Sequence, residues 1–175
     1  MNKTTNQASG TIQVRSNMNM KELDKTDKGI LKLLEQDGTL THKEIAYRLR
    51  KTVNPIHARI RNLENGGYIK KYRADVDHKK VGKGLICYTQ VQLKQHSKES
   101  LNAYKVEVIK VPEVMECYHL TGPFDFLLRI ACKDIDEYNI ILNEKLSVLP
   151  DVGNMQSLFV MSEVKHETGY MFDEN

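Results

Sequence analysis

The sequence predicts an α+β protein with two domains, an N-terminal winged helix-turn-helix domain followed by a ferredoxin-like βαββαβ domain. Three observations predict this arrangement. The 175 residues, of which 40% are hydrophobic, can form one ordinary core or two small ones. Residues 1–80 contain 17 Lys and Arg against 9 Asp and Glu, whereas residues 81–175 contain 9 against 14. The apolar pattern also changes near Gly84, from helical spacing to an alternation of strands and helices.

These changes divide the chain into five segments. Residues 1–20 are polar and have no apolar periodicity, which is typical of a disordered tail. Residues 21–70 form the predicted helix-turn-helix domain, and residues 71–84 a hinge strand or linker. Residues 85–166 form the predicted ferredoxin-like domain, and residues 167–175 a C-terminal tail.

Three short helices are expected in the basic half. Asp24 can cap the first, which buries isoleucine and leucine side chains and stops at Gly38. Thr41 and Glu44 have the spacing of a capping box and begin the second. Thr52 is the expected N-cap of the third helix, which ends before the glycine pair at positions 66 and 67.

The third helix divides into two faces when its residues are placed at intervals of roughly 100°. One face is apolar and is expected to pack on the other two helices: Val53, Ile56, Ile60 and Leu63. The opposite face is polar or small: Asn54, His57, Ala58 and Arg61. This division is typical of a recognition helix that enters the major groove of DNA. A three-helix packing unit with a solvated outer face would show the same pattern.

The excess of basic residues around this helix favours double-stranded DNA as the partner. Asn54 can pair with adenine, Arg61 with guanine or a phosphate, and Ala58 can contact a thymine methyl group. The expected DNA contacts are Lys43, Arg50, Lys51, Thr52, Asn54, His57, Ala58, Arg59, Arg61 and Lys70. The next segment, YIKKYRADVD, alternates like a strand and is expected to form a wing or hinge strand that also touches phosphates.

The acidic half has the element order strand, helix, strand, strand, helix, strand. The expected strands are LICYTQVQLK, VMECYHLTG, FDFLLRIAC and SLFVMSEVK, and the expected helices span about 98–110 and 135–149. This order predicts a ferredoxin-like antiparallel sheet with both helices on one face. The fold alone indicates no particular function, because it serves many.

Residues 22–166 resemble the Lrp/AsnC family of bacterial and archaeal transcription regulators. The first helix carries LDKTDKGILKLLEQDG, and the helix-turn-helix carries KEIAYRL and IHARIRNLENGGYIKKY. VGKG leads into the second domain, which contains PEVMECYHLTGPFDFLLRI and LPDVGNMQSLFVMSEVK. The resemblance implies a sequence-specific DNA-binding regulator of transcription. Its second domain would bind an effector and form dimers through back-to-back sheets, which often assemble into larger oligomers.

The resemblance further implies that a small effector, usually an amino acid, binds between dimers near the loop TGPFD. Gly122 would free backbone groups for the ligand, and Asp125 could hold its ammonium group. Thr121, Gln156 and Ser157 are further polar candidates. The same four residues Gly-Pro-Phe-Asp also make a good β-turn that needs no ligand.

The sequence departs from the family in the turn between the second and third helices. Arg50 occupies the position where relatives usually have glycine, and Lys51 follows where they have an apolar residue. An arginine in the left-handed conformation is less favourable than glycine by about 1 kcal/mol. Both replacements are basic, so they could add phosphate contacts.

Two other functions fit parts of this pattern. Siroheme decarboxylases resemble the family and use histidines, but the six histidines here show no paired or metal-like spacing, so neither catalysis, a cofactor nor a metal is expected. An architectural DNA-binding protein without sequence preference or effector is the alternative to a regulator. Cys87, Cys117 and Cys132 lack CxxC spacing and are expected to be buried thiols. No apolar run could span a membrane, which favours the cytoplasm.

Overall fold

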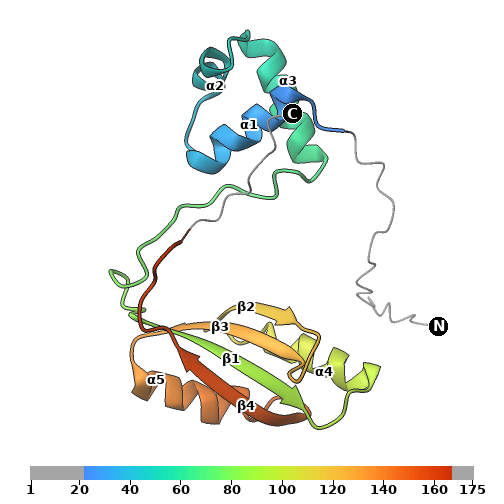
Figure 1. The fold of residues 1–175 in the computed structure, drawn as a ribbon, viewed down its shortest axis with the longest axis vertical. Coiled ribbons are helices and arrows are strands. Elements are labelled where there is room, and N and C mark those ends of the chain that lie inside the picture. The colour runs from blue at the N-terminus through green and yellow to red at the C-terminus, as the bar shows by residue number, and fades with distance from the viewer. Residues whose placement is uncertain (1–21, 167–175) are drawn as a thin grey trace, which may run out of the picture. The chain divides into compact units, whose positions relative to one another are not determined.

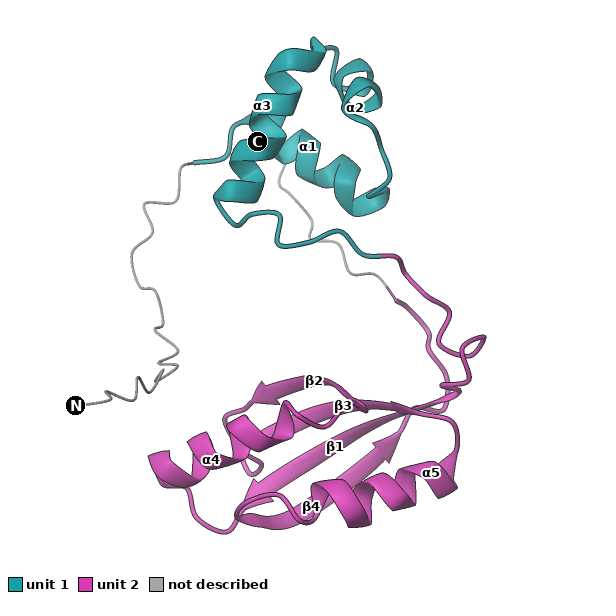
Figure 2. Ribbon diagram, turned by 180° about the vertical axis from the view of Figure 1, so that it is seen from behind, with its two compact units in different colours: residues 1–73, 168–175 teal, residues 74–167 magenta. Residues whose placement is uncertain are grey.

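The computed structural model describes residues 22–166, and the expected tails at 1–20 and 167–175 lie outside this range. The described chain divides into two compact units, the first ending at Arg73 and the second beginning at Ala74 (Figure 2). Each unit has its own apolar core. The predicted fold class, a helix-turn-helix domain followed by a βαββαβ domain, is confirmed (Figure 1).

The first unit contains the helices α1 (Lys25–Gln36), α2 (His42–Arg48) and α3 (Val53–Asn65). Asp24 caps α1 by accepting hydrogen bonds from the amides of Thr26 and Asp27, both at 2.8 Å. The capping box of α2 is formed, with Thr41 and Glu44 bonding to each other's backbone. The core of the unit is completely or almost completely buried: Ile30, Leu31, Leu40, Ile45, Ala46, Ile56, Ile60 and Leu63.

The second unit is a four-stranded antiparallel sheet in the order β2-β3-β1-β4. Its elements, in chain order, are β1 (Leu85–Leu93), α4 (Lys98–Val108), β2 (Val114–His119), β3 (Phe126–Cys132), α5 (Ile135–Ile140), the π-helical turn η1 (Ile141–Leu146) and β4 (Val152–Phe159). The expected second helix is thus α5 continued by η1. The two middle strands, β3 and β1, are the most apolar, as a buried centre requires.

The two faces of the sheet have different surroundings. Alternate residues of β1 and β3 point to the face that the helices cover and form the core with Tyr104 of α4 and Tyr138 of α5. Figure 1 shows the four strands with both helices of this unit beside them. On the other face Tyr88 pairs with Leu158 across the strands, and Tyr118 with Leu127. Tyr118 and Leu158 are 51% and 46% exposed, so this second, open face carries uncovered apolar surface.

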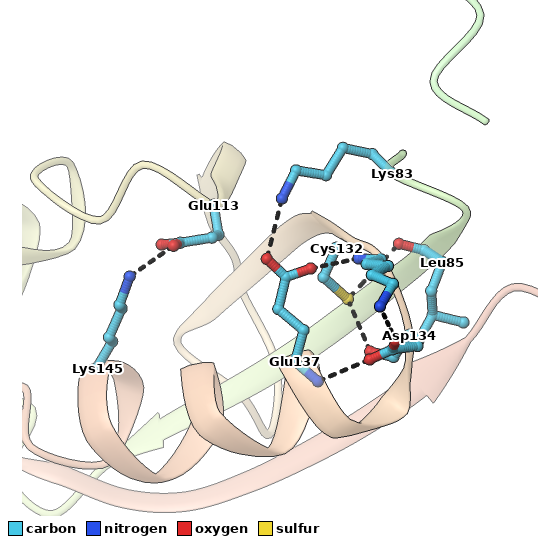
Figure 3. Close-up of polar contacts among 8 residues, drawn as sticks. Lys83, Leu85, Glu113, Cys132, Asp134, Glu137 and Lys145 are labelled. Atoms are coloured by element: carbon cyan, nitrogen blue, oxygen red, sulfur yellow. Dashed lines mark hydrogen bonds and ion pairs between the residues drawn. The ribbon is translucent and has the colours of Figure 1, made fainter. Parts of the chain in front are cut away.

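Polar contacts fix the start of α5 and the loop that precedes β1 (Figure 3). Asp134 caps the helix by accepting from the amide of Glu137 at 2.9 Å. The Glu137 carboxylate also accepts from the amide of Lys133 and pairs with the ammonium of Lys83 at 3.1 Å. The thiol of Cys132 lies within this network and donates to a backbone oxygen of Asp134 at 3.5 Å. Lys83 thereby connects the segment before β1 to the start of α5.

A separate ion pair joins the other end of this helical segment to the sheet. Lys145 in η1 lies 2.5 Å from Oε1 of Glu113, just before β2 (Figure 3). The side chain of Glu113 is only 17% exposed, and its second oxygen, Oε2, has no hydrogen-bond partner among the described residues. Burial raises the pKa of Glu113, but the hydrogen bond and charge of Lys145, together with a backbone hydrogen bond and the charge of Lys83, hold that pKa below its ordinary value.

Three predicted features differ in the structure. The last strand begins at Val152 rather than Ser157, because its register with β1 pairs Val152 with Leu93 and Asn154 with Gln92. The segment YIKKYRADVD forms no strand in the described part of the chain, because a strand needs a partner to complete its hydrogen bonds and none pairs with it here. All three cysteines are free thiols, as predicted, but Cys117 is only partly buried.

Candidate DNA-binding and effector sites

The third helix separates a buried face from an exposed face, as its sequence predicts. Ile56, Ile60 and Leu63 are at most 3% exposed and pack in the core of the first unit. Asn54, His57, Ala58 and Arg61 are all exposed. Val53 was expected on the buried face but is 42% exposed, because it is the first residue of the helix and lies beyond the edge of the core.

The turn between α2 and α3 is a Schellman motif with arginine in the left-handed position. The amide of Lys51 donates to the carbonyl of Ala46 at 2.9 Å, and the amide of Arg50 donates to that of Tyr47 at 3.1 Å. This pairing requires a left-handed residue directly after the helix cap, and Arg50 has a φ of +53°. Of the two expectations for this turn, a reshaped backbone or an arginine in the left-handed conformation, the structure has the second. The side chains of Arg50 and Lys51 are exposed.

The exposed residues around this turn have free polar atoms. Thr52 is the N-cap of α3 by its backbone, but its hydroxyl makes no capping hydrogen bond. Within residues 22–166, no side-chain hydrogen bond or ion pair involves the following expected DNA contacts: Lys43, Arg50, Lys51, Thr52, Asn54, Arg61 and Lys70. A ligand that supplied acceptors would therefore break no internal contact.

Arg59 has a structural role that differs from the expected phosphate contact. Its Nη1 lies 2.6 Å from Asp24 and 2.7 Å from Asp27, at the start of α1. The Asp27 side chain is 8% exposed and that of Arg59 33%. Hydrogen bonds to Asp27 and Asp24 raise the pKa of Arg59. The guanidinium of Arg59 is thus already paired with two carboxylates inside the first unit.

Asp125 connects two loops at one end of the second unit. Its Oδ2 accepts from the amide of Leu93 at the end of β1, and its Oδ1 lies on Nδ1 of His96, both at 2.8 Å. The Asp125 side chain is 14% exposed and that of His96 59%. The Asp125 carboxylate therefore bonds to the end of a neighbouring strand rather than to the backbone of its own turn, and the exposed His96 side chain contacts its second oxygen. His96 has no motif around it that could have predicted this role.

The other effector candidates lie in two different places. Thr121 and Gly122 are exposed in the loop before β3, and Gly122 has a φ of +120°, which a residue with a side chain would rarely adopt. Gln156 and Ser157 are consecutive on β4 and point to opposite faces of the sheet. Gln156 pairs with Gln90 on the open face, whereas Ser157 bonds to the buried hydroxyl of Tyr138. These two residues cannot line one side of a single site.

The described residues contain neither a metal-binding cluster nor a thiol with a lowered pKa. Residues 22–166 contain no cluster of His, Cys, Asp and Glu that could hold a metal ion. Burial raises the pKa of Cys132 to about 11, and that of Cys117 is also raised, so neither thiol is an activated nucleophile. No helix in this part of the chain is long and apolar enough to cross a membrane.

Comparison with known proteins gives the same division of the chain. Residues 23–70 match the family model described as winged helix-turn-helix DNA-binding, and residues 86–170 match that of the Lrp/AsnC ligand binding domain. A proline dehydrogenase transcriptional activator of Rhizobium radiobacter is 35% identical over 148 residues, covering 85% of this chain and 94% of that protein. The leucine-responsive regulatory protein of Escherichia coli K12 is 31% identical over 145 residues, covering 83% and 88%.

Solved structures agree with the fold. A Neisseria meningitidis transcriptional regulator in complex with L-methionine has a TM-score of 0.81 and 32% identity, covering 86% of this chain and 97% of that one. The Escherichia coli AsnC structure has a TM-score of 0.78 and 24% identity over 85% of this chain and 98% of that one, and at this identity it supports the fold alone.

Proposed function

Because the chain belongs to the Lrp/AsnC family of transcriptional regulators, we propose that it binds specific DNA sequences through α3 and the turn before it, under the control of an amino-acid effector. One observation carries the DNA-binding part. The exposed face of α3 and the Schellman turn together present polar and cationic groups that have no internal partners among the described residues. A groove roughly 12 Å wide can accept such a helix.

The division of roles follows from position and chemistry. Asn54, His57 and Arg61 lie on the exposed face of α3 and would contact base edges, with Ala58 against a thymine methyl group. The residues that would contact phosphates lie beside that helix: Lys43, Arg50, Lys51, Thr52 and Lys70. Arg59 takes no part, because it is paired with Asp24 and Asp27.

A salt titration of DNA binding tests this proposal. The logarithm of the binding constant should fall linearly with the logarithm of the salt concentration. This should hold both for a duplex selected from a random pool and for an unrelated duplex. The selected duplex should bind at least about a thousandfold more tightly. Absence of all DNA affinity at low salt would contradict the proposal, and equal affinity for both duplexes would favour the architectural alternative.

The effector site is proposed at the loop that contains Thr121, Gly122 and Asp125. Support comes from the exposed, positive-φ backbone at Gly122 and from the carboxylate of Asp125, which could receive an ammonium group if His96 moved away. The related regulator of Neisseria meningitidis was solved with L-methionine. Ser157 is not part of the proposed site, because its hydroxyl is bonded to Tyr138. Gln156 would contact the ligand only if the ligand reached the open face of the sheet.

A thermal-shift screen of the free amino acids tests the effector proposal. L-methionine and L-leucine are the first probes, because the neighbours named above are a methionine complex and a leucine-responsive protein. A saturating effector at about 100 times its Kd should stabilise the second unit by about 2.7 kcal/mol. No shift with any amino acid would contradict the proposal.

Self-association is proposed through the open face of the sheet. Tyr88, Tyr118, Leu127 and Leu158 place aromatic and aliphatic surface there, and no element of the described chain covers it. A second copy of the same face would bury this surface in an isologous dimer. Light scattering at micromolar protein concentration should show a dimer or a larger oligomer, and Leu158→Lys should shift it toward the monomer.

A further inference from the structure

Two histidine rings meet on the exposed side of the helix-turn-helix unit. The ring of His42, the first residue of α2, lies 5.1 Å from that of His57 on α3, measured between centroids, with the planes tilted by 53°. Both residues are exposed. Within residues 22–166 neither ring forms a hydrogen bond or an ion pair, so all four ring nitrogens are available to a ligand.

Both rings stand on fixed backbone. The capping box holds the start of α2, since Glu44 accepts from the amide of Thr41 at 2.7 Å and donates its own amide to the Thr41 hydroxyl at 3.3 Å. The backbone of His57 is held by its neighbour Ile56, which is completely buried, and by the rest of the apolar face of α3. The contact between the rings therefore joins two rigid positions rather than two mobile ones.

We propose that His42 is a positioning residue for base readout by His57. An exposed histidine has several rotamers, and fixing one of them on binding DNA reduces affinity. The ring of His42 packs on His57 and removes part of that freedom before DNA arrives. His57 then directs an imidazole N–H toward the groove, where purines present N7 and guanine also presents O6 as acceptors. The preferred partner is a purine, and guanine in particular.

This inference rests on the proposed function, because it requires α3 to lie in the major groove. It assigns to His42 a role that neither its charge nor its place in the sequence indicates. It also predicts that His42 acts only through His57. Substitutions of the two histidines should therefore be coupled, and both should affect the base preference at the same position of the DNA site.

Selection from a randomised duplex pool tests the proposal with the full-length protein and five variants. His57→Ala identifies the base position that His57 reads, where the purine preference should fall by about tenfold. His42→Ala should lower the preference at that same position by about threefold, and the double variant should match His57→Ala alone. His42→Phe keeps a ring against His57 and should restore the preference. Lys43→Ala, at the exposed residue that follows His42 in α2, should lower overall affinity without changing any base preference.

The outcomes separate the two levels of the proposal. If the wild-type protein enriches no sequence, sequence-specific binding and the role of His42 fail together. If it enriches a site but His42→Ala leaves the purine preference intact, only the role of His42 is overturned. Failure of His42→Phe to restore the preference would also overturn positioning, because it would mean that a nitrogen of His42 itself contacts DNA. Thermal midpoints of the variants should equal that of the wild type, since both residues are exposed.

Discussion

Arg59 on α3 joins Asp24 and Asp27 at the start of α1, with its Nη1 at 2.6 and 2.7 Å from their carboxylates. One cation therefore connects α3 to the first helix, next to the core of the unit. Asp27 is 6% exposed, so its charge has little access to water. Hydrogen bonding to the amide of Asp27 and to Arg59 lowers the pKa of Asp24, which keeps that carboxylate ionised.

Replacement of Arg59 by alanine should destabilise the first unit. The change leaves the nearly buried Asp27 carboxylate without its partner, which should lower the free energy of unfolding by about 1–3 kcal/mol. Urea unfolding followed by circular dichroism measures this loss. Arg61→Ala is the matched control, because Arg61 lies two residues away, is exposed, and should change stability by less than about 0.5 kcal/mol. Equal stability of the two variants would contradict the structural role of Arg59.

How far the sequence predicts such features depends on whether they are local. The caps of α1 and α2 depend on residues within a few positions, and the sequence predicts both of them. The pairing of Arg59 depends on carboxylates 32 and 35 positions away, which only the packing of α1 against α3 brings near.

The same distinction applies to the second unit. The element order and the buried face of its helices follow from local periodicity, and both are confirmed. The start of β4 depends on register with Leu93, far away in the chain, and its prediction was wrong by five residues. The contact of Asp125 with Leu93 and His96 is likewise non-local, and a β-turn pattern could indicate only that the aspartate bonds to some backbone amide.

Substitutions at Arg50 should separate backbone strain from DNA contact. Arg50→Gly removes the unfavourable left-handed conformation at a φ of +53° and should stabilise the first unit by about 0.5–1 kcal/mol. Arg50→Ala keeps the strain and should leave stability nearly unchanged. Both variants lack the guanidinium and should bind DNA more weakly. The slope of the logarithm of affinity against the logarithm of salt concentration should fall by the amount expected for about one phosphate contact. Thermal unfolding and filter binding measure the two effects, and unchanged DNA affinity in both variants would remove Arg50 from the interface.

Arg61 and Lys51 should differ in how they affect DNA recognition. Arg61→Ala should weaken binding to the selected site by about 1–3 kcal/mol and leave binding to unrelated DNA nearly unchanged, because Arg61 faces the base edges. Lys51→Ala should weaken binding to both and flatten the salt dependence, as loss of a phosphate contact does. Titrations of both duplexes at several salt concentrations measure these effects. Parallel losses in the two variants would contradict the division of roles.

The pair of Glu113 and Lys145 should make the stability of the second unit depend on pH in the acid range (Figure 3). The folded protein holds the pKa of Glu113 below its ordinary value of 4.5, chiefly through Lys145 acting against burial. The pair therefore stabilises the fold above pH 4.5, and this contribution disappears as the pH falls through the lowered pKa.

Lys145→Met tests this dependence. At pH 7 the variant should be less stable by about 1 kcal/mol, since Lys145 is 39% exposed and solvent screens part of the interaction. The difference in stability between the variant and the wild type should shrink as the pH falls through the acid range. The reason is that Glu113 without Lys145 becomes protonated at a higher pH than in the wild type. Lys110→Met is the control, because its pair with Glu107 lies on the exposed surface. A difference that stays constant from pH 7 to pH 3 would contradict the electrostatic explanation.

His96 should compete with an amino-acid effector for the carboxylate of Asp125. The imidazole occupies Oδ1 at 2.8 Å but is 59% exposed, so it can move away at little cost in buried contacts. His96→Ala frees this oxygen and should tighten binding of an effector ammonium group by about threefold to tenfold. Asp125→Asn should abolish binding while keeping an acceptor for the Leu93 amide. Isothermal titration with the amino acid that gives the largest thermal shift measures both changes, and weaker binding by His96→Ala would instead make the histidine a part of the ligand site.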